Sequence, residues 1–302
     1  MQQVTLNNDF LRLTTLNYGA IIQKLMVVGK DGKETNVVVG FENPEDYLKD
    51  TFSLGACIGR YAGRISNGGF HLNGRRYELY QQDGVHLHGG KQGLGKRYWN
   101  LLEVHEGTDP FVRYQYESPE MEEGYPGNLK VTVTYQLLKN TLKIIHEATT
   151  DRATVVNLTN HSYFKLDGAP TVEQLQLKLH SSSFLETDHK LLPTGRILPV
   201  EDSPYDFSTK KAIGKLHLDT PFCIGPSKEA IAEVSSPSSG LRLRVFTNQP
   251  AVVVFTPSVF PAICFETQNY PDAPTFAHFP SALLRPGETY HNESDFVFDL
   301  VP

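Results

Sequence analysis

The chain has 302 residues, enough for one large domain or two of ordinary size. Apolar residues make up 39% of it and charged residues 21%, values that exclude a disordered, coiled-coil or collagen-like chain. The formal charge of -6 comes from acidic and basic side chains that are interspersed along the sequence, so we expect no nucleic-acid partner.

No apolar run approaches the roughly 20 residues of a membrane span, and the first nine residues lack the basic start and apolar core of a signal peptide. We therefore expect a cytoplasmic protein without a membrane partner. Cys57, Cys223 and Cys264 cannot all pair, and each has apolar neighbours. We interpret all three as reduced, structural residues.

The predicted elements are mostly strands with alternating apolar and polar side chains. A helical turn is predicted at 44–48, strands follow at 130–137 and 174–179, a second helical turn at 208–213, and another strand at 241–245. The scarcity of longer helices argues against a doubly wound nucleotide-binding fold. No linker or internal repeat is visible, so we predict an all-β protein, a single large antiparallel β-sandwich domain over 1–302.

Two segments with familiar binding motifs are interpreted as structural. The glycine-rich stretch 89–95 has no Ser or Thr after Lys91, so we expect an ordinary flexible loop and no phosphate site. His86 and His88 would share one face of an extended segment, but no further ligand follows at metal spacing. We therefore predict no metal site.

The segment 157–164 is unusual because an extended strand there would carry polar groups on both faces. One face would hold Asn157, Thr159, His161 and Tyr163, and the other Asn160 and Ser162. Buried polar groups must be hydrogen-bonded or meet a ligand. A lone histidine in a core is usually a hydrogen-bonded structural residue, but this density of polar neighbours favours a site.

Glu266 interrupts the apolar strand predicted at 263–269. A carboxylate in surroundings of low dielectric constant has a raised pKa, which suits a general base that works near neutral pH. A glutamate that faces water at the end of a strand is an equally good interpretation of this segment alone.

Taken together, several blocks make the sequence resemble the galactose mutarotase (aldose 1-epimerase) family over most of its length. The blocks lie at 17–20, 59–65, 87–90, 123–127, 157–164, 218–222 and 266–272. The resemblance implies a β-supersandwich with an open cleft, and an enzyme without a cofactor that interconverts the α- and β-anomers of a free aldose. The implied partner is a monosaccharide, and the implied assembly is a monomer or homodimer.

By matching motifs, the resemblance implies that Glu266 is the general base and His161 the general acid. Four further residues are implied to contact or orient the sugar: Arg64, His88, Asp219 and Gln249. Structural roles stay open for these four. In particular, Arg64 could be a salt-bridged strand residue, with Arg60 as the sugar ligand in its place.

The chemistry of anomers sets an expectation about the geometry of the acid and the base. Anomers interconvert only if the bond between C1 and the ring oxygen opens, because C1 must become planar before its other face is presented. We expect the base that takes the C1 hydroxyl proton and the acid that protonates the ring oxygen to act from opposite sides of the ring.

Departures from the family pattern bear on the choice of substrate. Gly63 stands where many members have asparagine, Lys165 where asparagine is common, Thr220-Pro221 where His-Asn is usual, and Tyr270 where many have tryptophan. Two alternatives therefore stay open. One is a hexose-6-phosphate mutarotase that uses cationic side chains (Arg60, Arg64, Lys96 and Arg97), and the other is a sugar-binding module without activity.

Overall fold

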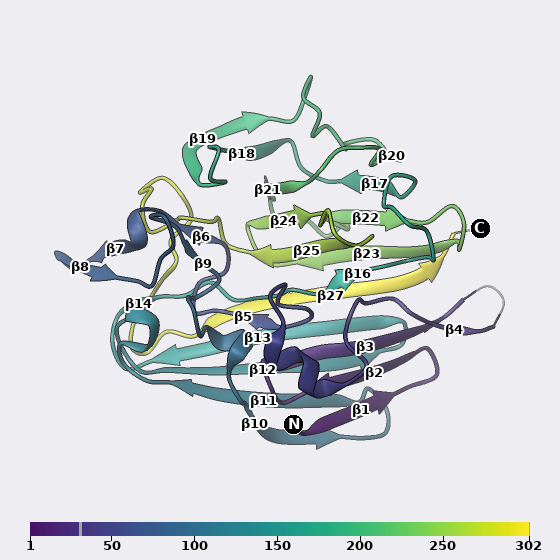
Figure 1. Ribbon diagram of the computed structural model, residues 1–302, viewed down its shortest axis with the longest axis horizontal. Helices are drawn as coiled ribbons and strands as arrows, with labels where there is room; N and C mark the ends of the chain where they lie inside the picture. Colours follow the sequence, from purple (N-terminus) through teal and green to yellow (C-terminus); the bar gives the residue numbers. More distant parts are fainter. Residues whose placement is uncertain (30–31, 302) are drawn as a thin grey trace.

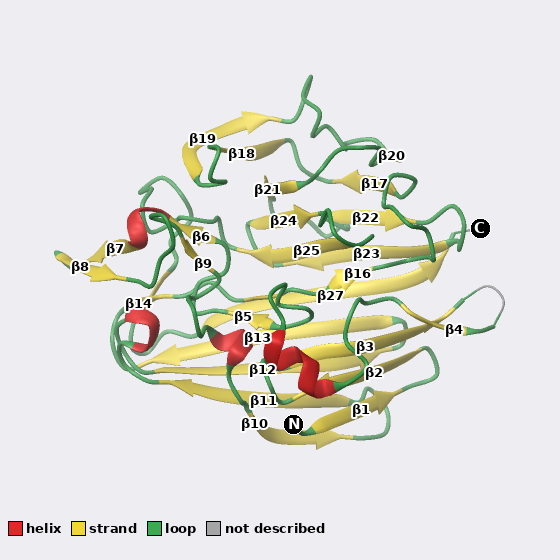
Figure 2. Cartoon of the chain, in the orientation of Figure 1, coloured by secondary structure: helices red, strands yellow, loops and turns green. Residues whose placement is uncertain are grey.

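The computed structural model describes residues 1–29 and 32–301 and consists mainly of strands (Figures 1 and 2). The largest sheet has nine strands, in the order β10 (Asn100–His105), β11 (Phe111–Ser118), β12 (Leu129–Leu138), β13 (Thr141–Thr150), β27 (Tyr290–Leu300), β23 (Leu241–Thr247), β22 (Ala232–Ser235), β17 (Gln176–Leu179) and β20 (Lys211–Ala212). The yellow strand β27 crosses the middle of the view between β13 and β23 (Figure 1).

A second sheet carries several of the predicted site residues. Its order is β16 (Tyr163–Phe164), β25 (Ile263–Gln268), β24 (Ala251–Phe255), β21 (Asp219–Cys223), β18 (Ser183–Thr187) and β19 (Pro193–Pro199). The pairings in both large sheets are antiparallel, which confirms the predicted all-β, antiparallel architecture.

Smaller elements complete the described fold. A four-stranded sheet contains β1 (Gln3–Asn7), β2 (Leu11–Leu16), β3 (Ile21–Val28) and β4 (Glu34–Asn36). The remaining strands form two-stranded pairs: β5 (Cys57–Ile58) with β15 (Thr159–Asn160), β6 (Arg64–Ile65) with β9 (His86–Leu87), β7 (Gly69–Leu72) with β8 (Arg75–Glu78), and β14 (Thr154–Val155) with β26 (Leu283–Leu284). The helices in the described part of the chain are short 3₁₀ helices: η1 (Pro44–Lys49), η2 (Ser66–Gly68), η3 (Leu94–Lys96) and η4 (Glu122–Gly124). No helix in the described part of the chain is long and apolar enough to cross a membrane.

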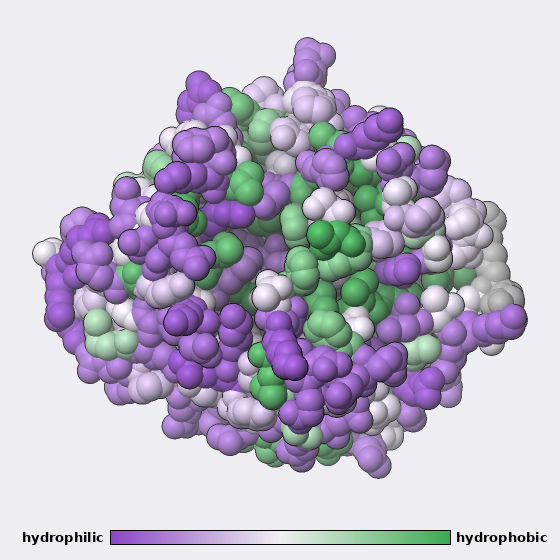
Figure 3. Space-filling view, viewed as in Figure 1, coloured by the Kyte–Doolittle hydropathy of each residue, from purple (hydrophilic) through white to green (hydrophobic). Residues whose placement is uncertain are grey.

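The main hydrophobic core lies on the inner faces of the sheets. The alternation of apolar and polar residues in the sequence predicted which side chains belong to it. In the strand predicted at 130–137, Val131, Val133, Tyr135 and Leu137 are all fully buried. Alternation places these side chains on one face because successive residues of a strand point to opposite sides. On the outside, the face seen in Figure 3 is largely hydrophilic, with hydrophobic residues gathered near its middle.

Three local expectations meet different outcomes. The helical turn predicted at 44–48 is η1, whereas the turn predicted at 208–213 is wrong, because Lys211–Ala212 forms strand β20 on the edge of β17. The glycine-rich segment 89–95 is tied down rather than a free loop. The carboxylate of Glu123 accepts hydrogen bonds from the N–H groups of Lys91 and Gln92, each at 2.9 Å.

The cysteines have the structural character predicted for them. All three are free; Cys57 and Cys264 are buried and Cys223 is half-buried. Burial raises the pKa of each thiol, so they are protonated near neutral pH.

His146 is a buried imidazole in β13 whose two nitrogens have no hydrogen-bond partner among the described residues. Burial lowers its pKa to about 3, against an ordinary value of 6.5 in the unfolded chain. Between these pH values the imidazole of His146 is protonated in the unfolded chain and neutral in the folded chain. The free energy of unfolding therefore falls as the pH drops from about 6.5 towards 3.

Replacing His146 by leucine is expected to raise the free energy of unfolding by about 1 kcal/mol at pH 7, because an unpaired buried polar group is removed. This difference in the free energy of unfolding should grow as the pH falls from 6.5 to 4, since the variant has no histidine to titrate at this position. Urea unfolding of both proteins across this pH range measures it. A variant that loses the same stability on acidification as the parent would contradict the assignment.

Candidate active site

A cavity of about 210 Å³ lies over one face of the six-stranded sheet and contains five of the six predicted site residues. The five are Arg64, His88, His161, Asp219 and Glu266. They come from five separate segments of the chain, and the tertiary fold brings them together. Apolar side chains form most of the remaining wall: Phe52, Leu87, Leu191, Pro221, Val253, Phe255 and Pro271.

Glu266 projects from the middle of β25, in which every residue is buried. Alternation directs Ile263 and Phe265 into the main core, so Glu266 points to the opposite, cavity face. Its carboxylate is 4% exposed, and Oε2 has no hydrogen-bond partner in the described structure. Burial and the nearby charge of Asp219 raise the pKa of Glu266 to about 8, which confirms the raised proton affinity that we expected.

His161 is held at the point where the chain passes from one sheet to another. It follows β15, which pairs with β5, and precedes β16, which pairs with β25. Its N–H donates to the carbonyl of Ala56 at 2.9 Å, and its carbonyl accepts from Gly55 N–H at 3.0 Å. The main chain of His161 is therefore fixed on both sides.

The polar residues around His161 are a scaffold for the site. Asn157 Nδ2 donates to the carbonyl of Ala62 at 3.1 Å, and its Oδ1 accepts from Asn269 N–H at 2.8 Å. Asn160 Nδ2 donates to the carbonyl of Gly55 at 2.9 Å. The segment 157–164 is thus not the single extended strand that we predicted, because its amides satisfy main-chain groups of neighbouring loops.

The imidazole of His161 lies in a mostly apolar setting. Its ring stacks on Tyr163 with 4.8 Å between centroids, and Nδ1 lies 3.8 Å from Cys264 Sγ. Burial lowers the pKa of His161 to about 4. The imidazole is therefore neutral near pH 7, which differs from the protonated acid implied by the resemblance.

The two residues implied as acid and base are adjacent, which does not fit the expectation of groups that act from opposite sides of the sugar ring. His161 Nε2 lies 3.6 Å from Glu266 Oε1, which leaves no room for a pyranose between them. The physical reason is that the C1 hydroxyl oxygen and the ring oxygen are bonded to the same carbon. Two groups that each hydrogen-bond to one of these oxygens can therefore be neighbours.

Arg64 and Asp219 form a second charged pair at the cavity. Arg64 Nη2 donates to Asp219 Oδ2 at 3.2 Å, and both side chains are partly exposed to the cavity. Arg60, the alternative ligand, points away and is only 2% exposed. The structure thus places Arg64, and not Arg60, at this cavity.

His88 follows β9 with a left-handed backbone, which turns its ring towards His161 and away from the core position of His86. The two histidines therefore do not share one face as predicted. His88 Nδ1 accepts a hydrogen bond from Gly63 N–H at 3.2 Å, so the proton of the neutral ring is on Nε2. Burial holds the pKa of His88 well below its usual range.

His88, His161 and Glu266 have ligand atoms within 4.8 Å of one another, close enough to be considered as a metal site. Zinc binds the unprotonated nitrogen of a neutral imidazole. Because Gly63 N–H occupies Nδ1 of His88, its Nε2–H is a hydrogen-bond donor and not a ligand. The arrangement fits a hydroxylated ligand better than a cation.

Gln249 does not line this cavity, so the structure does not support the sugar contact that we expected of it. Its Nε2 donates to the carbonyl of His291 at 3.2 Å and to Asn248 Oδ1 at 2.7 Å. Glu266 pairs in register with Val253, four residues further along the chain, and the cavity wall is formed by Val253. Four residues of strand span about 13 Å, too far for the Gln249 side chain.

Some residues at the cavity escaped the sequence analysis. Tyr163 stacks on His161 and donates through its hydroxyl to the carbonyl of Phe52 at 2.9 Å. Phe255 pairs in register with Asp219 and directs its ring edge-to-face at His161, 6.4 Å away. Tyr163 lay in a block already singled out, whereas nothing in the sequence separated Phe255 from ordinary core residues.

An antiparallel β-sandwich whose cavity combines an adjacent imidazole and carboxyl with an arginine, an aspartate and a second histidine has the features of a sugar-processing enzyme. The family model described as aldose 1-epimerase matches residues 2–296, and the chain belongs to this family. It is 37% identical to a galactose mutarotase of Homo sapiens over 99% of this chain and 94% of that protein. It is 31% identical to an aldose 1-epimerase of Escherichia coli, over 97% and 93% respectively.

The fold of this chain is also closely similar to that of a solved structure. An aldose epimerase homologue from C. elegans superposes with a TM-score of 0.95 at 32% sequence identity, covering 100% of this chain and 99% of that one. The predicted family and supersandwich fold are therefore confirmed.

Proposed function

We propose that this protein catalyses the interconversion of the α- and β-anomers of a free hexose such as galactose or glucose. The observation that carries the proposal is the pairing of Glu266 and His161 at 3.6 Å inside a cavity that also holds Arg64, His88 and Asp219. The curated relatives that share a third of the sequence are named as mutarotases or aldose epimerases.

The pair supplies the one base and the one acid that ring opening needs. One group takes the proton of the C1 hydroxyl, a C1 carbonyl forms, and the bond between C1 and the ring oxygen breaks. The electron pair of that bond stays on the ring oxygen, which receives a proton from the other group. After rotation about the bond between C1 and C2, the same transfers run in reverse and close the ring as the other anomer.

Burial decides where the shared proton is held. With the pKa of Glu266 raised to about 8 and that of His161 lowered to about 4, the pair holds one proton between these values. The opposite directions of these shifts favour the proton on Glu266. A pair that holds one proton has one acid and one base for ring opening, and the roles are exchanged on closing.

The other polar groups bind and orient the sugar. The Arg64 guanidinium and the Asp219 carboxylate present donors and acceptors to ring hydroxyls, and the Nε2–H of His88 adds a directed donor. The Phe255 ring and the other apolar walls suit the C–H faces of a pyranose.

The charges in the cavity favour a free sugar over a sugar phosphate. Arg64 is the one cationic residue among those that line it, and it is already paired with Asp219. Arg97 is bound to Glu122 at 2.9 Å, and Lys96 lies against the carbonyl of Lys91. A pure binding module is disfavoured as well, because binding alone gives no reason to bury a carboxyl beside an imidazole.

Polarimetry of freshly dissolved α-galactose and α-glucose tests the proposed activity. Optical rotation should relax faster with the protein than in buffer, in proportion to enzyme concentration. Bovine serum albumin at the same concentration controls for weak catalysis by surface groups. No acceleration on either hexose, or on other common aldoses, would refute the proposal.

The rate is expected to show a bell-shaped dependence on pH, with limbs near 4 and 8. Below about 4 His161 is protonated and the pair has no base, and above about 8 Glu266 has lost its proton and the pair has no acid. Initial rates of rotation change, corrected for the buffer reaction, measure the profile of kcat/KM. A profile that is flat from pH 4 to 9 would contradict this proton pair.

A further inference from the structure

Cys264 is a buried thiol beside the proposed proton-transfer pair, and the reaction proposed for that pair gives it no role. It is fully buried in β25, and its Sγ lies 3.8 Å from His161 Nδ1. Sulfur is a weak hydrogen-bonding atom whose bonds are longer than those of oxygen, and this distance is within its reach. Cys264 is not among the residues that line the cavity, so it is placed to act on the imidazole and not on a sugar.

Strand β25 faces both nitrogens of the His161 ring. Cys264 and Glu266 are two residues apart, so alternation places them on one face of the strand, opposite the side chains that enter the main core. His161 Nδ1 faces Cys264 Sγ at 3.8 Å, and Nε2 faces Glu266 Oε1 at 3.6 Å. The imidazole thus lies between a thiol and a carboxyl of the same strand.

The partner of Nδ1 matters because a neutral imidazole carries its proton on one nitrogen only. With that proton on Nε2, the ring would present a donor to Glu266 and could not take a proton from it. With the proton on Nδ1, the lone pair of Nε2 faces the carboxyl and can accept its proton. The second arrangement is the one that suits a pair whose shared proton is on Glu266.

A buried Nδ1–H needs an acceptor, and the sulfur of Cys264 provides one. A thiol can donate as well as accept, but only an accepting sulfur leaves the lone pair of Nε2 facing Glu266. Burial holds the pKa of the Cys264 thiol well above its usual range, so the sulfur accepts as a neutral thiol and adds no charge to the site. The main-chain carbonyl of His161 also favours a proton on the ring.

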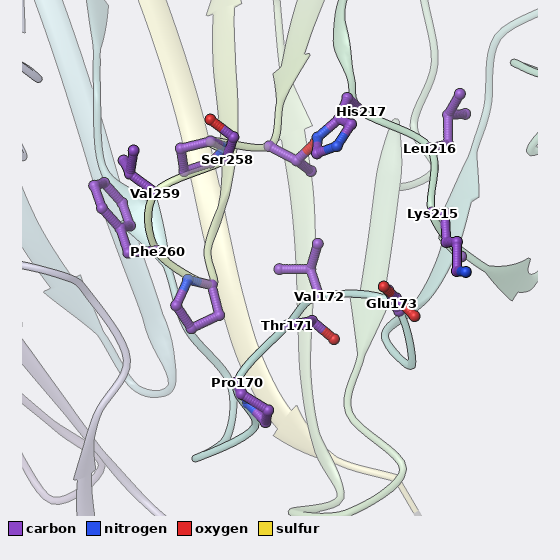
Figure 4. A pocket seen from close by; sticks show the side chains of 14 residues that line it. Pro170, Thr171, Val172, Glu173, Lys215, Leu216, His217, Ser258, Val259 and Phe260 are labelled. Atoms are coloured by element: carbon purple, nitrogen blue, oxygen red, sulfur yellow. The ribbon is translucent and has the colours of Figure 1, made fainter.

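Aromatic neighbours fix the plane of the His161 ring. Tyr163 stacks on it at 4.8 Å, and the Tyr163 hydroxyl donates to the carbonyl of Phe52. Phe260 packs edge-to-face on Tyr163 at 5.2 Å from the loop that joins β24 to β25, where Figure 4 shows it beside Val259. This packing orients the ring but does not decide which nitrogen holds the proton.

The neighbouring His88 illustrates how the partner of Nδ1 sets the tautomer. There a donor, Gly63 N–H, occupies Nδ1, and the ring proton is on Nε2. The His88 and His161 rings meet edge-to-face at 5.2 Å. An acceptor at Nδ1 of His161 gives the opposite tautomer in the adjacent ring.

Resting on the proposed function, we propose that Cys264 is a positioning residue for anomer interconversion. Its sulfur accepts the Nδ1–H of His161 and thereby keeps the lone pair of Nε2 directed at Glu266. Because Cys264 acts through His161, its removal slows proton transfer and leaves the binding of the sugar unchanged.

NMR of protein labelled with ¹⁵N-histidine tests the tautomer without reference to activity. The His161 signals are assigned by their absence in His161→Gln. At pH 7 we expect a protonated Nδ1 and an unprotonated Nε2 in the parent, and a shift of the proton towards Nε2 in Cys264→Ala. A parent ring with its proton on Nε2, or a Cys264→Ala ring with the tautomer of the parent, would overturn the proposal.

Polarimetry with galactose measures the consequence for the rate. We expect Cys264→Ala to lower kcat about tenfold with KM within about twofold of the parent, and Cys264→Ser, whose hydroxyl can accept the same hydrogen bond, to recover part of the loss. Cys223→Ala is the matched control, since it removes a thiol of the same sheet that lies beside Ser183 and Tyr270, and its kcat should equal that of the parent.

The kinetic outcomes separate the two proposals. An unchanged kcat in folded Cys264→Ala, or a rise in KM alone, would overturn the positioning role while the parent still accelerates mutarotation. A parent that accelerates mutarotation of no aldose would overturn the proposed function, and the NMR experiment would still show which nitrogen of His161 carries the proton.

Discussion

Replacing Glu266 by glutamine is expected to lower kcat for anomer interconversion by about 10²- to 10⁴-fold, with a much smaller change in KM. Glutamine has the same shape and fits the buried position, but it cannot exchange the proton that the pair with His161 holds. The buried carboxyl carries a raised pKa, so the variant removes a titrating group without leaving a buried charge. Polarimetry over a range of galactose concentrations separates the two constants.

The matched control for this experiment is Gln249→Ala. Gln249 was expected to contact the sugar, yet its side chain bonds to His291 and Asn248 outside the cavity. We therefore expect kcat and KM of this variant to stay within about twofold of the parent, as for a substitution remote from the site. A Glu266→Gln protein that is folded but keeps more than about a tenth of the parent kcat would remove Glu266 from the proton-transfer steps.

Replacing Arg60 by methionine is expected to destabilise the fold by about 3 kcal/mol or more, because buried acceptors lose a charged donor. Arg60 Nε donates to Ser118 Oγ at 2.8 Å, Nη2 to the carbonyls of Ser118 and Pro119, and Nη1 to those of Pro126 and Gly127. Burial lowers the pKa of this guanidinium to about 10, so it stays charged at neutral pH. Urea unfolding at pH 7 measures the loss.

The neighbouring Arg64 supplies the comparison. Its ion pair with Asp219 is partly exposed, so Arg64→Met should change stability by about 1 kcal/mol or less, while kcat/KM falls about tenfold or more. Arg60→Lys keeps the charge and some of the hydrogen bonds, and its stability should fall between those of the parent and Arg60→Met. If Arg60→Met were as stable as Arg64→Met, the structural role of Arg60 would be wrong.

The all-β architecture was accessible from the sequence because strand periodicity is local. Alternation at 130–137 needs only the preference of successive side chains for opposite faces, and the structure buries the predicted side chains. The order of the sheets depends on contacts between distant segments. The pairing of β13 with β27, which brings 141–148 against 290–297, has no local signal.

The residues that stood out chemically in the sequence lie together at one cavity, whereas the position of Gln249 depends on geometry that the sequence does not contain. Glu266 was noticed because a carboxylate in an apolar strand is costly unless it has a purpose. Gln249 was misplaced because its neighbourhood in the sequence says nothing about register, and register puts Val253 opposite Glu266. Asn157 and Asn160 attracted attention as polar residues, but their partners are main-chain groups of distant loops.

By itself, the sequence determined the class of fold and the family, and it singled out the two side chains to which we assign proton exchange, since alternation and unusual residue types are properties of short segments. Only the tertiary structure decided that Glu266 and His161 are neighbours and that burial shifts their pKa values in opposite directions. Distance, desolvation and register depend on segments that are separate in the sequence, and no short stretch of the chain contains them.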